Sequence, residues 1–217
     1  MWKTHKKSIV LAVVVILLPI LAGVALWDQL PQSMPIHFGV DNQPNGWAPR
    51  PFAVFGMPVI MAALELLAVA VTSADPRHKQ ISDKAFALVL WIIPVMSVVL
   101  MLVTYAASMG QAVPVGQIVM VLLGVIFMAC GNYLPKSGQN HSLGVRIPWT
   151  LEDPENWRAT HRVAAWCFIV GGLLIAVLGM FFLHWLLLFL FIPMTVIPVL
   201  YSYWYYRKHG GNSHAED

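Results

Sequence analysis

Residues 131–162 read GNYLPKSGQNHSLGVRIPWTLEDPENWRATHR and form the longest polar interval between the apolar runs of the chain. The interval combines turn-forming residues, four basic groups and two tryptophans, and apolar sequence flanks it on both sides. Ordered loops longer than about 12–15 residues are usually functional or disordered. The aromatic content of this interval argues against disorder. We therefore expect specific function to reside in this stretch or close to it.

The composition of the rest of the chain is typical of a membrane protein. Of the 217 residues 59% are apolar and 11% are charged, whereas soluble domains carry roughly 25% charged residues. A helix that crosses a bilayer needs about 20 mainly apolar residues. Six runs meet this requirement, near 8–27, 52–73, 85–108, 115–133, 163–183 and 185–206. The predicted fold class is an all-α membrane protein with six transmembrane helices.

The positions of the basic residues predict the orientation of these helices. With the N-terminus in the cytoplasm, 12 of the 13 Lys and Arg residues lie on the cytoplasmic side and Arg50 alone lies outside. This is the asymmetry that the positive-inside rule describes. We predict a multi-pass protein of the plasma membrane with both termini cytoplasmic, an outer loop between helices 1 and 2 and a long cytoplasmic loop between helices 4 and 5. Anionic lipids, and no nucleic acid, are the expected partners of the basic residues.

The connecting segments and the cysteines give further local predictions. Residues 109–114 are a short link between two helices, and a second tight link is expected at His184. Ser82 is a candidate helix cap, and Gly171-Gly172 allows close helix approach. The two cysteines lie in apolar runs, so we expect no disulfide and no zinc framework.

The outer segment, residues 28–50, is too rich in proline for a continuous helix. Asn45-Gly46 is predicted as a turn pair. His37, Asp41 and Trp47 bring recognition chemistry, but one His with one nearby Asp is a weak ligand set. A folded cap with a solvated His is the alternative.

Glu65 is the only acidic residue inside a predicted span. A charged carboxylate at mid-depth costs about 2.5–3.5 kcal/mol on insertion scales, so it should face the bundle or be protonated. One hypothesis makes it a proton or ligand site. The alternative is a carboxyl that hydrogen-bonds to a neighbouring helix. The absence of a basic residue within a span favours a neutral carboxylic acid.

The second half of the opening stretch contains a helix start. Asp153 is predicted to cap a helix that begins at Pro154 and continues into the fifth span. Trp157 and His161 are four residues apart and share one face, as do Arg158 and Arg162. We expect this turn at the headgroup zone, with Trp157 at the interface and the arginines near phosphates.

Arg146 fits that role less well, because it lies among apolar and turn residues in the segment 144–150. An arginine in such surroundings is expected to pair with a carboxylate, with backbone carbonyls or with a ligand.

On these residues the chain resembles the SdpI family of bacterial membrane proteins. The family pattern is an Asn, a Gly-x-Arg-x-Pro-Trp-Thr-Leu run and a Trp-x-x-Thr-His-Arg run. It stands here as Asn140, Gly144, Arg146, Pro148, Trp149, Thr150, Leu151, Trp157, Thr160, His161 and Arg162. The outer segment, with Pro35, His37, Phe38, Gly46 and Trp47, resembles a small domain of unknown function (DUF1648) often found ahead of it. Asn42-Gln43 stands where that second pattern has a Gly.

The resemblance implies a 1–73 helix-loop-helix and a 74–217 four-helix transmembrane domain. The last residues, 210–217, are predicted to be a disordered tail. The resemblance also implies an immunity protein that resists a secreted toxic peptide and relays a signal to a cytosolic repressor. No cofactor and no catalytic residue follow from it. The predicted ligand- or partner-binding residues are Asn140, Gly144, Arg146, Pro148, Trp149, Thr150, Trp157, His161, Arg162, His37 and Trp47, which stand in the family patterns, and Glu65, which is proposed from its position in a span.

Two other function classes stay open. A small transporter is favoured by Glu65, although no inverted repeat or paired broken helices are visible. A membrane-embedded enzyme would use Glu65, His37 or His161. The predicted threading places the two histidines on opposite sides, and no HExxH, GxSxG or phosphate-loop motif is present. A binding protein is therefore the leading hypothesis.

Overall fold

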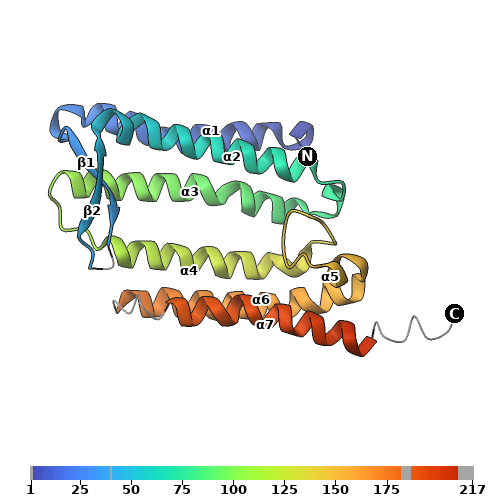
Figure 1. The fold of residues 1–217 in the computed structure, drawn as a ribbon. Coiled ribbons are helices and arrows are strands. Elements are labelled where there is room, and N and C mark those ends of the chain that lie inside the picture. Colours follow the sequence, from blue (N-terminus) through green and yellow to red (C-terminus); the bar gives the residue numbers. More distant parts are fainter. Residues whose placement is uncertain (1, 40, 182–186, 210–217) are drawn as a thin grey trace. The chain divides into compact units, whose positions relative to one another are not determined.

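The structure is a computed structural model that describes residues 2–39, 41–181 and 187–209. Its helices and strands follow the order α1, β1, β2, α2, α3, α4, α5, α6 and α7 (Figure 1). Short 3-10 turns and one π-helix, Phe52–Gly56, lie between them. The bounds are α1 Trp2–Ala25, β1 Ser33–Phe38, β2 Pro44–Pro49, α2 Met57–Ala74, α3 Asp83–Ser108, α4 Val115–Tyr133, α5 Pro148–Glu152, α6 Pro154–Met180 and α7 Leu187–His209.

Within the described residues, six helical segments are long and apolar enough to cross a membrane. They are Thr4–Ala25, Phe52–Ala74, Asp83–Ser108, Val115–Lys136, Pro154–Met180 and Phe189–His209. Helices dominate in lipid because each satisfies its own backbone hydrogen bonds. The predicted fold class is confirmed in the number and character of its helices, whereas their orientation stays a prediction. The predicted link at His184 and the tail 210–217 lie outside the described residues.

The chain forms two compact units. The first comprises residues 1–73 and 89–122, and the second comprises 74–88 and 123–217. The predicted domains 1–73 and 74–217 stay a prediction.

In the first unit, α1, α2 and α3 lie side by side and the two strands cross one end of them (Figure 1). The buried core at that end comprises Leu30, Met34, Ala53, Val54, Met101 and Tyr105. Two α3 side chains bond to α1 near Pro19: Ser97 Oγ donates to the Ile16 carbonyl over 2.9 Å, and Tyr105 Oη donates to the Pro19 carbonyl over 2.9 Å. The part of α1 around Pro19 is thereby fixed to α3.

The outer segment folds as an antiparallel hairpin of β1 and β2, which pairs Met34 with Ala48 and His37 with Gly46. The predicted turn at Asn45-Gly46 is therefore wrong, because both residues lie inside β2. The chain reverses between Gly39 and Gln43, where the Gly39 N–H donates to the Gln43 carbonyl over 2.8 Å. Gly46 instead allows β2 to lie close to His37 on β1, because a Cβ at position 46 would lie 2.9 Å from the Cβ of His37.

Arg50 closes the base of the hairpin. Its guanidinium donates to the carbonyls of Trp27 and Leu30 over 2.7 and 2.9 Å, and it stacks on the Trp27 ring at 4.2 Å. Arg50, the one basic residue predicted to lie outside, thus forms its hydrogen bonds and its ring contact within the first unit.

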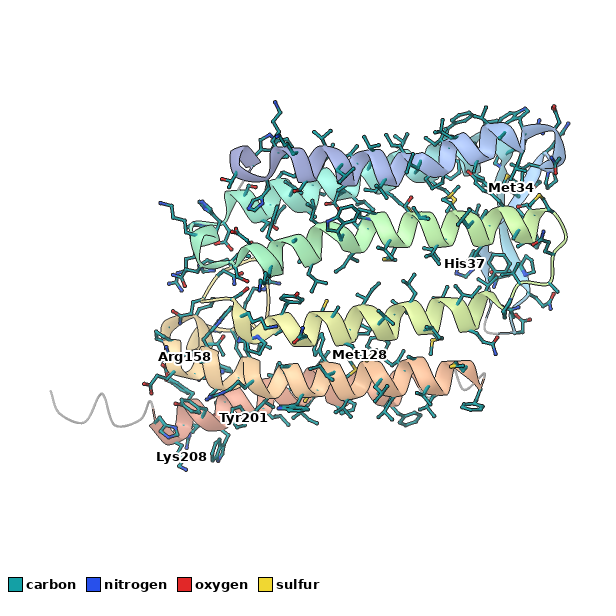
Figure 2. The ribbon with its side chains drawn as sticks, turned by 180° about the vertical axis from the view of Figure 1, so that it is seen from behind. Met34, His37, Met128, Arg158, Tyr201 and Lys208 are labelled. Atoms are coloured by element: carbon teal, nitrogen blue, oxygen red, sulfur yellow. The ribbon has the colours of Figure 1, made fainter. Side chains whose placement is uncertain are left out.

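In the second unit, α6 and α7 lie side by side, and α6 packs on α4 (Figure 1). A Cβ at Gly172 would lie 2.6 Å from the Gly124 carbonyl, so the close approach predicted for Gly171-Gly172 is confirmed. Phe127 adds edge contacts to Phe168 and Phe191, with ring centroids 5.6 and 5.3 Å apart. The end at which α6 begins and α7 ends carries Arg158, Tyr201 and Lys208 (Figure 2). The residues that connect α4 to α6 lie at the same end.

Candidate functional site

The loop between α4 and α5 is a folded element built around Asn140, whose side chain is fully buried. Its Oδ1 accepts from the N–H groups of Ser142 and Leu143 over 2.9 and 2.6 Å, and its Nδ2 donates to the Gly138 carbonyl over 2.9 Å. Asn side chains stabilise turns by bonding to backbone groups nearby. The amide at position 140 thus sets the path of the loop.

Asp75 anchors this loop from the segment between α2 and α3. One carboxylate oxygen accepts from the His141 N–H and from Ser142 Oγ, both over 2.7 Å, and the other accepts from the Arg77 N–H over 2.8 Å. Burial by itself raises the pKa of this carboxyl. The donated hydrogen bonds and the nearby His141 ring outweigh burial, so the pKa of Asp75 lies below its ordinary value.

Further backbone bonds join the same two segments. The Gly138 N–H donates to the Gln80 carbonyl over 2.9 Å, and Arg77 donates to the Leu151 carbonyl over 3.0 Å. The loop and the 74–82 segment therefore form one hydrogen-bonded body. Ser82 caps α3 as predicted, because its Oγ accepts from the Ala85 N–H over 3.2 Å.

His161 holds the middle of the loop against α6. Its Nδ1 lies 2.8 Å from the Trp157 carbonyl, and its Nε2 lies 3.1 Å from the Val145 N–H. A carbonyl can only accept, so Nδ1 carries the proton and Nε2 accepts. The neutral ring satisfies both contacts.

Gly144 is required by this arrangement. Its φ of +102° lies in the region that favours glycine, and an added Cβ would lie only 2.0 Å from His161 Nε2. Any side chain at position 144 would push the loop away from the imidazole.

Thr150 closes the loop where α5 begins. Its hydroxyl is fully buried, accepts from the Ile147 N–H over 3.1 Å and lies 2.8 Å from the Val145 carbonyl. Gln139 reaches across the loop and donates to the Thr150 carbonyl over 2.9 Å. The predicted cap of the next helix is confirmed, because Asp153 Oδ1 accepts from the Glu155 N–H over 2.7 Å.

The two tryptophans of the loop region have different surroundings. Trp157 is 2% exposed, stacks on His161 with 4.0 Å between centroids and donates to the Ser137 carbonyl over 3.0 Å. The predicted position of Trp157 at the interface is therefore wrong: tertiary packing buries its ring. Trp149 is half-buried, and its Nε1 donates to Ser202 Oγ on α7 over 3.0 Å.

Trp149 also joins the aromatic end of α7. Its ring lies 5.5 Å from that of Tyr203 and 5.9 Å from that of Tyr206. Beneath it, Asn156 is fully buried and donates to the Ser202 carbonyl over 3.0 Å. This polar network fixes α5, α6 and α7 to one another.

The arginines remain on the surface. Arg146, Arg158 and Arg162 are all exposed. One Arg146 nitrogen donates to the His141 carbonyl, which is the carbonyl contact that its surroundings predicted. The rest of that guanidinium is free to meet a partner, and Pro148 is exposed nearby in the sequence.

The predicted residues of the first unit do not form one cluster. His37 is exposed and bonds through Nδ1 to Asn45 Oδ1, and Trp47 is 56% exposed on β2. Glu65 lies on α2 and is 1% exposed. The hairpin therefore exposes side chains that a partner could contact, whereas the side chain of Glu65 is buried inside the protein.

Asn42 docks the hairpin turn on the link between α3 and α4. Its Nδ2 donates to the Val113 carbonyl over 3.0 Å, and its Oδ1 accepts from the Gly116 N–H over 2.9 Å. Its φ of +62° is the conformation for which a Gly would be the usual residue, and Asn tolerates it. An uncharged cavity of about 550 Å³ lies between the turn and residues 111–114.

Two family comparisons locate the known sequence patterns on this structure. Residues 136–202 match the SdpI/YfhL protein family, and residues 14–62 match a domain of unknown function, DUF1648. The chain is also 29% identical over 214 residues to the protein named Immunity protein SdpI of Bacillus subtilis (strain 168). The matched region covers 95% of this chain and 99% of that protein. The chain is therefore similar to the SdpI/YfhL family over residues 136–202. No solved structure matches it.

The chain is a multi-pass protein of the plasma membrane, with six helices of suitable length and apolarity in its described part. Eight residues of the SdpI pattern form two groups. Asn140, Gly144, Thr150, Trp157 and His161 hold the loop together. Arg146, Pro148 and Arg162 are exposed and are the members of the pattern that a partner could contact.

The sequence did not point to Asp75, Asn156 and Ser202, although all three organise the site. Asp75 had a local signal, since an Asp-Pro pair marks a turn, but its partner is 66 residues away. Asn156 and Ser202 gave no signal that separates them from ordinary helix residues.

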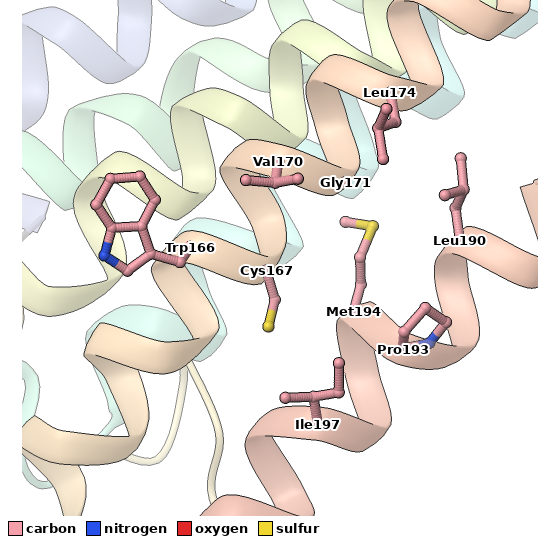
Figure 3. Close-up of a pocket in the computed structure, with 9 residues that line it drawn as sticks. All are labelled: Trp166, Cys167, Val170, Gly171, Leu174, Leu190, Pro193, Met194 and Ile197. Atoms are coloured by element: carbon pink, nitrogen blue, oxygen red, sulfur yellow. The ribbon is translucent and has the colours of Figure 1, made fainter.

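Helices α6 and α7 line an open apolar cavity of about 320 Å³ (Figure 3). Leu174, Leu190 and Met194 line it together with the ring of Pro193, and Trp166 lies at its edge. Such a lining suits a hydrocarbon chain rather than a polar ligand. Among the residues that the structure describes, no group of three or more His, Cys, Asp or Glu side chains could hold a metal ion.

Proposed function

We propose that this protein is a membrane immunity protein that protects the cell carrying it from a secreted toxic peptide. The observation that carries this proposal is the similarity to Immunity protein SdpI over nearly the whole length of both proteins. An insertion or a partial match would support only a shared domain, whereas a full-length match supports a shared role.

The two polar elements have separate roles in this proposal. The hairpin, predicted to lie outside, meets the peptide through Trp47 and through the cavity beside its turn. The loop, predicted to lie in the cytoplasm, presents Arg146 to a cytosolic partner such as a transcriptional repressor. The exposed Arg158 and Arg162 attract anionic lipids, each contributing about 1 kcal/mol.

The test is expression of the protein in a bacterium that a candidate secreted peptide kills. Growth is measured against peptide concentration, with an empty vector as the baseline. Protection that equals the baseline for every peptide to which the host is sensitive contradicts the proposal.

A matched pair of variants tests the role of the hairpin. Trp47→Ala removes an exposed tryptophan from the hairpin, and Trp166→Ala removes one that is 70% exposed on α6. Large aromatic residues dominate binding interfaces. Trp47→Ala should lower the tolerated peptide concentration at least tenfold, which corresponds to about 1.4 kcal/mol, while Trp166→Ala should not. Equal effects of both variants, at equal protein levels, would move the peptide contact away from the hairpin.

Transport is a second candidate, and one observation favours it. Glu65 is buried in a span without a hydrogen-bond partner among the described residues. Intramembrane carboxyls commonly mark ion or proton pathways.

A further inference from the structure

The buried polar atoms without a partner are concentrated on α2. In the described part of the chain there are four such side-chain atoms: both carboxylate oxygens of Glu65, Ser73 Oγ and Ser137 Oγ. Three of the four belong to one helix. Folded proteins satisfy nearly all buried polar groups, and each exception calls for an explanation.

Glu65 lies near the middle of its span. The apolar segment runs from Phe52 to Ala74, and Glu65 is about 14 Å along the helix axis from its end at Ala74. Its side chain is 1% exposed and shares the buried face of α2 with Ala62, Val69 and Thr72. The carboxyl thus faces protein and not lipid.

An ionised carboxylate at this depth requires a cation. Metal cations such as Ca²⁺ take about six to eight oxygen ligands, whereas both oxygens of Glu65 are buried without a hydrogen-bond partner among the described residues. A proton needs one ligand only, and its binding removes the charge that makes burial unfavourable. The single carboxyl therefore selects a proton over a metal ion.

The same face of α2 continues toward the 74–82 segment with hydroxyl groups. Thr72 follows Glu65 by seven residues, which is nearly two full turns, and is 5% exposed. Ser73 adds the unpartnered hydroxyl. Hydroxyl groups in a buried position can hold water molecules, so these two residues mark a route between the carboxyl and the end of the helix.

We propose that Glu65 is a proton-binding site inside the membrane span, and that Thr72 and Ser73 line the route by which its proton exchanges with water. In the loaded form the carboxylate has taken a proton from water and become a neutral carboxylic acid. This site is independent of peptide immunity and does not require it.

Infrared spectroscopy of the full-length protein in lipid vesicles tests the proposal. A protonated carboxyl gives a carbonyl band that an ionised carboxylate lacks. We expect such a band in the wild-type protein at neutral pH, its loss in Glu65→Gln and its shift when the vesicles are transferred to D₂O. The Gln side chain is nearly isosteric with the neutral acid and should preserve folding, whereas Glu65→Lys should not.

A second pair of variants tests the route. Ser73→Ala removes the unpartnered hydroxyl, and Ser97→Ala removes a buried hydroxyl that already donates to Ile16. Deuterium exchange of the band should slow at least severalfold in Ser73→Ala and stay unchanged in Ser97→Ala. A spectrum without a band attributable to Glu65 overturns the site, and a band that never shifts in D₂O shows a sealed structural carboxyl. Equal exchange rates in both serine variants overturn the route.

Discussion

At the residue scale, Gly144 and His161 depend on each other. The imidazole accepts from the Val145 N–H only because position 144 has no Cβ. Gly144→Ala should therefore destabilise the second unit by more than backbone strain alone, which costs about 1 kcal/mol or more. Thermal unfolding of the purified protein in detergent measures the effect.

Gly110 provides the control for that prediction. It also has a positive φ, of +79°, but an added Cβ would meet nothing within 4 Å. Gly110→Ala introduces backbone strain without a steric clash, so the unfolding temperature of this variant should fall less than that of Gly144→Ala. If the two variants unfold at the same temperature, the contact with His161 does not contribute.

Asp75 predicts a pH dependence of stability. Its pKa is depressed in the folded protein, so its stabilising contribution is present above the ordinary carboxyl pKa, near 3.8, and is lost as the pH falls through the lower folded value. Asp75→Asn should lower stability at neutral pH by about 1–3 kcal/mol, because the amide turns a donor toward the donors of the loop. It should also flatten the acid limb of the unfolding-temperature profile.

The comparison variant is Asp28→Asn, which removes an exposed carboxyl from the first unit. Its acid limb should match that of the wild type. An unchanged acid limb in Asp75→Asn would show that the hydrogen bonds to His141 and Ser142 do not stabilise the fold.

Substitutions at Arg146 show whether function needs only its positive charge or also its planar guanidinium. A lysine can keep one hydrogen bond to the His141 carbonyl and the positive charge, but it cannot present the planar fork. Arg146→Lys should lose protection or signalling nearly as fully as Arg146→Ala, whereas Arg158→Lys should be tolerated because charge suffices near headgroups. The peptide-challenge assay, with protein levels checked by immunoblot, decides this. Full protection by Arg146→Lys would reduce the loop to a charged anchor.

At the element scale, the hairpin is held to the rest of its unit through Asn42. Asn42→Gly keeps the backbone conformation but removes the bonds to Val113 and Gly116, each contributing about 0.5–1.5 kcal/mol. Hydrogen-deuterium exchange of the hairpin amides should then be roughly tenfold faster. Asn45→Gly, which removes only the contact to His37, should leave the docking of the turn intact. Unchanged exchange in Asn42→Gly would mean that the hairpin is held by its apolar contacts alone.

At the scale of the whole molecule, orientation in the bilayer follows from charge. A single cysteine at Ser33 should react with a membrane-impermeant thiol reagent in intact cells, and one at Glu152 should react only after lysis. Both positions are exposed, and the background lacks Cys130 and Cys167. Ser137 is unsuitable because it is buried. Labelling of position 152 in intact cells would reverse the predicted threading.

The sequence by itself determined the helices and their caps. Apolar runs of about 20 residues become helices because lipid offers no partner to an unpaired backbone group. The start of α6 could also be predicted from the sequence, because Asp153 accepts a hydrogen bond from Glu155, only two residues away. The sequence likewise marked residues 131–162 as the stretch in or near which function is expected, and the structure shows hydrogen-bonded, ordered backbone within it.

Only the tertiary structure decided what each marked residue does. It buried Trp157, joined Asp75 to His141 across 66 residues and joined Trp149 to Ser202 across 53. It also replaced a predicted turn at Asn45-Gly46 by a strand. Local propensity and charge act between neighbours in the sequence and can be read from it. Burial and hydrogen bonding between distant segments arise only when packing brings those segments together.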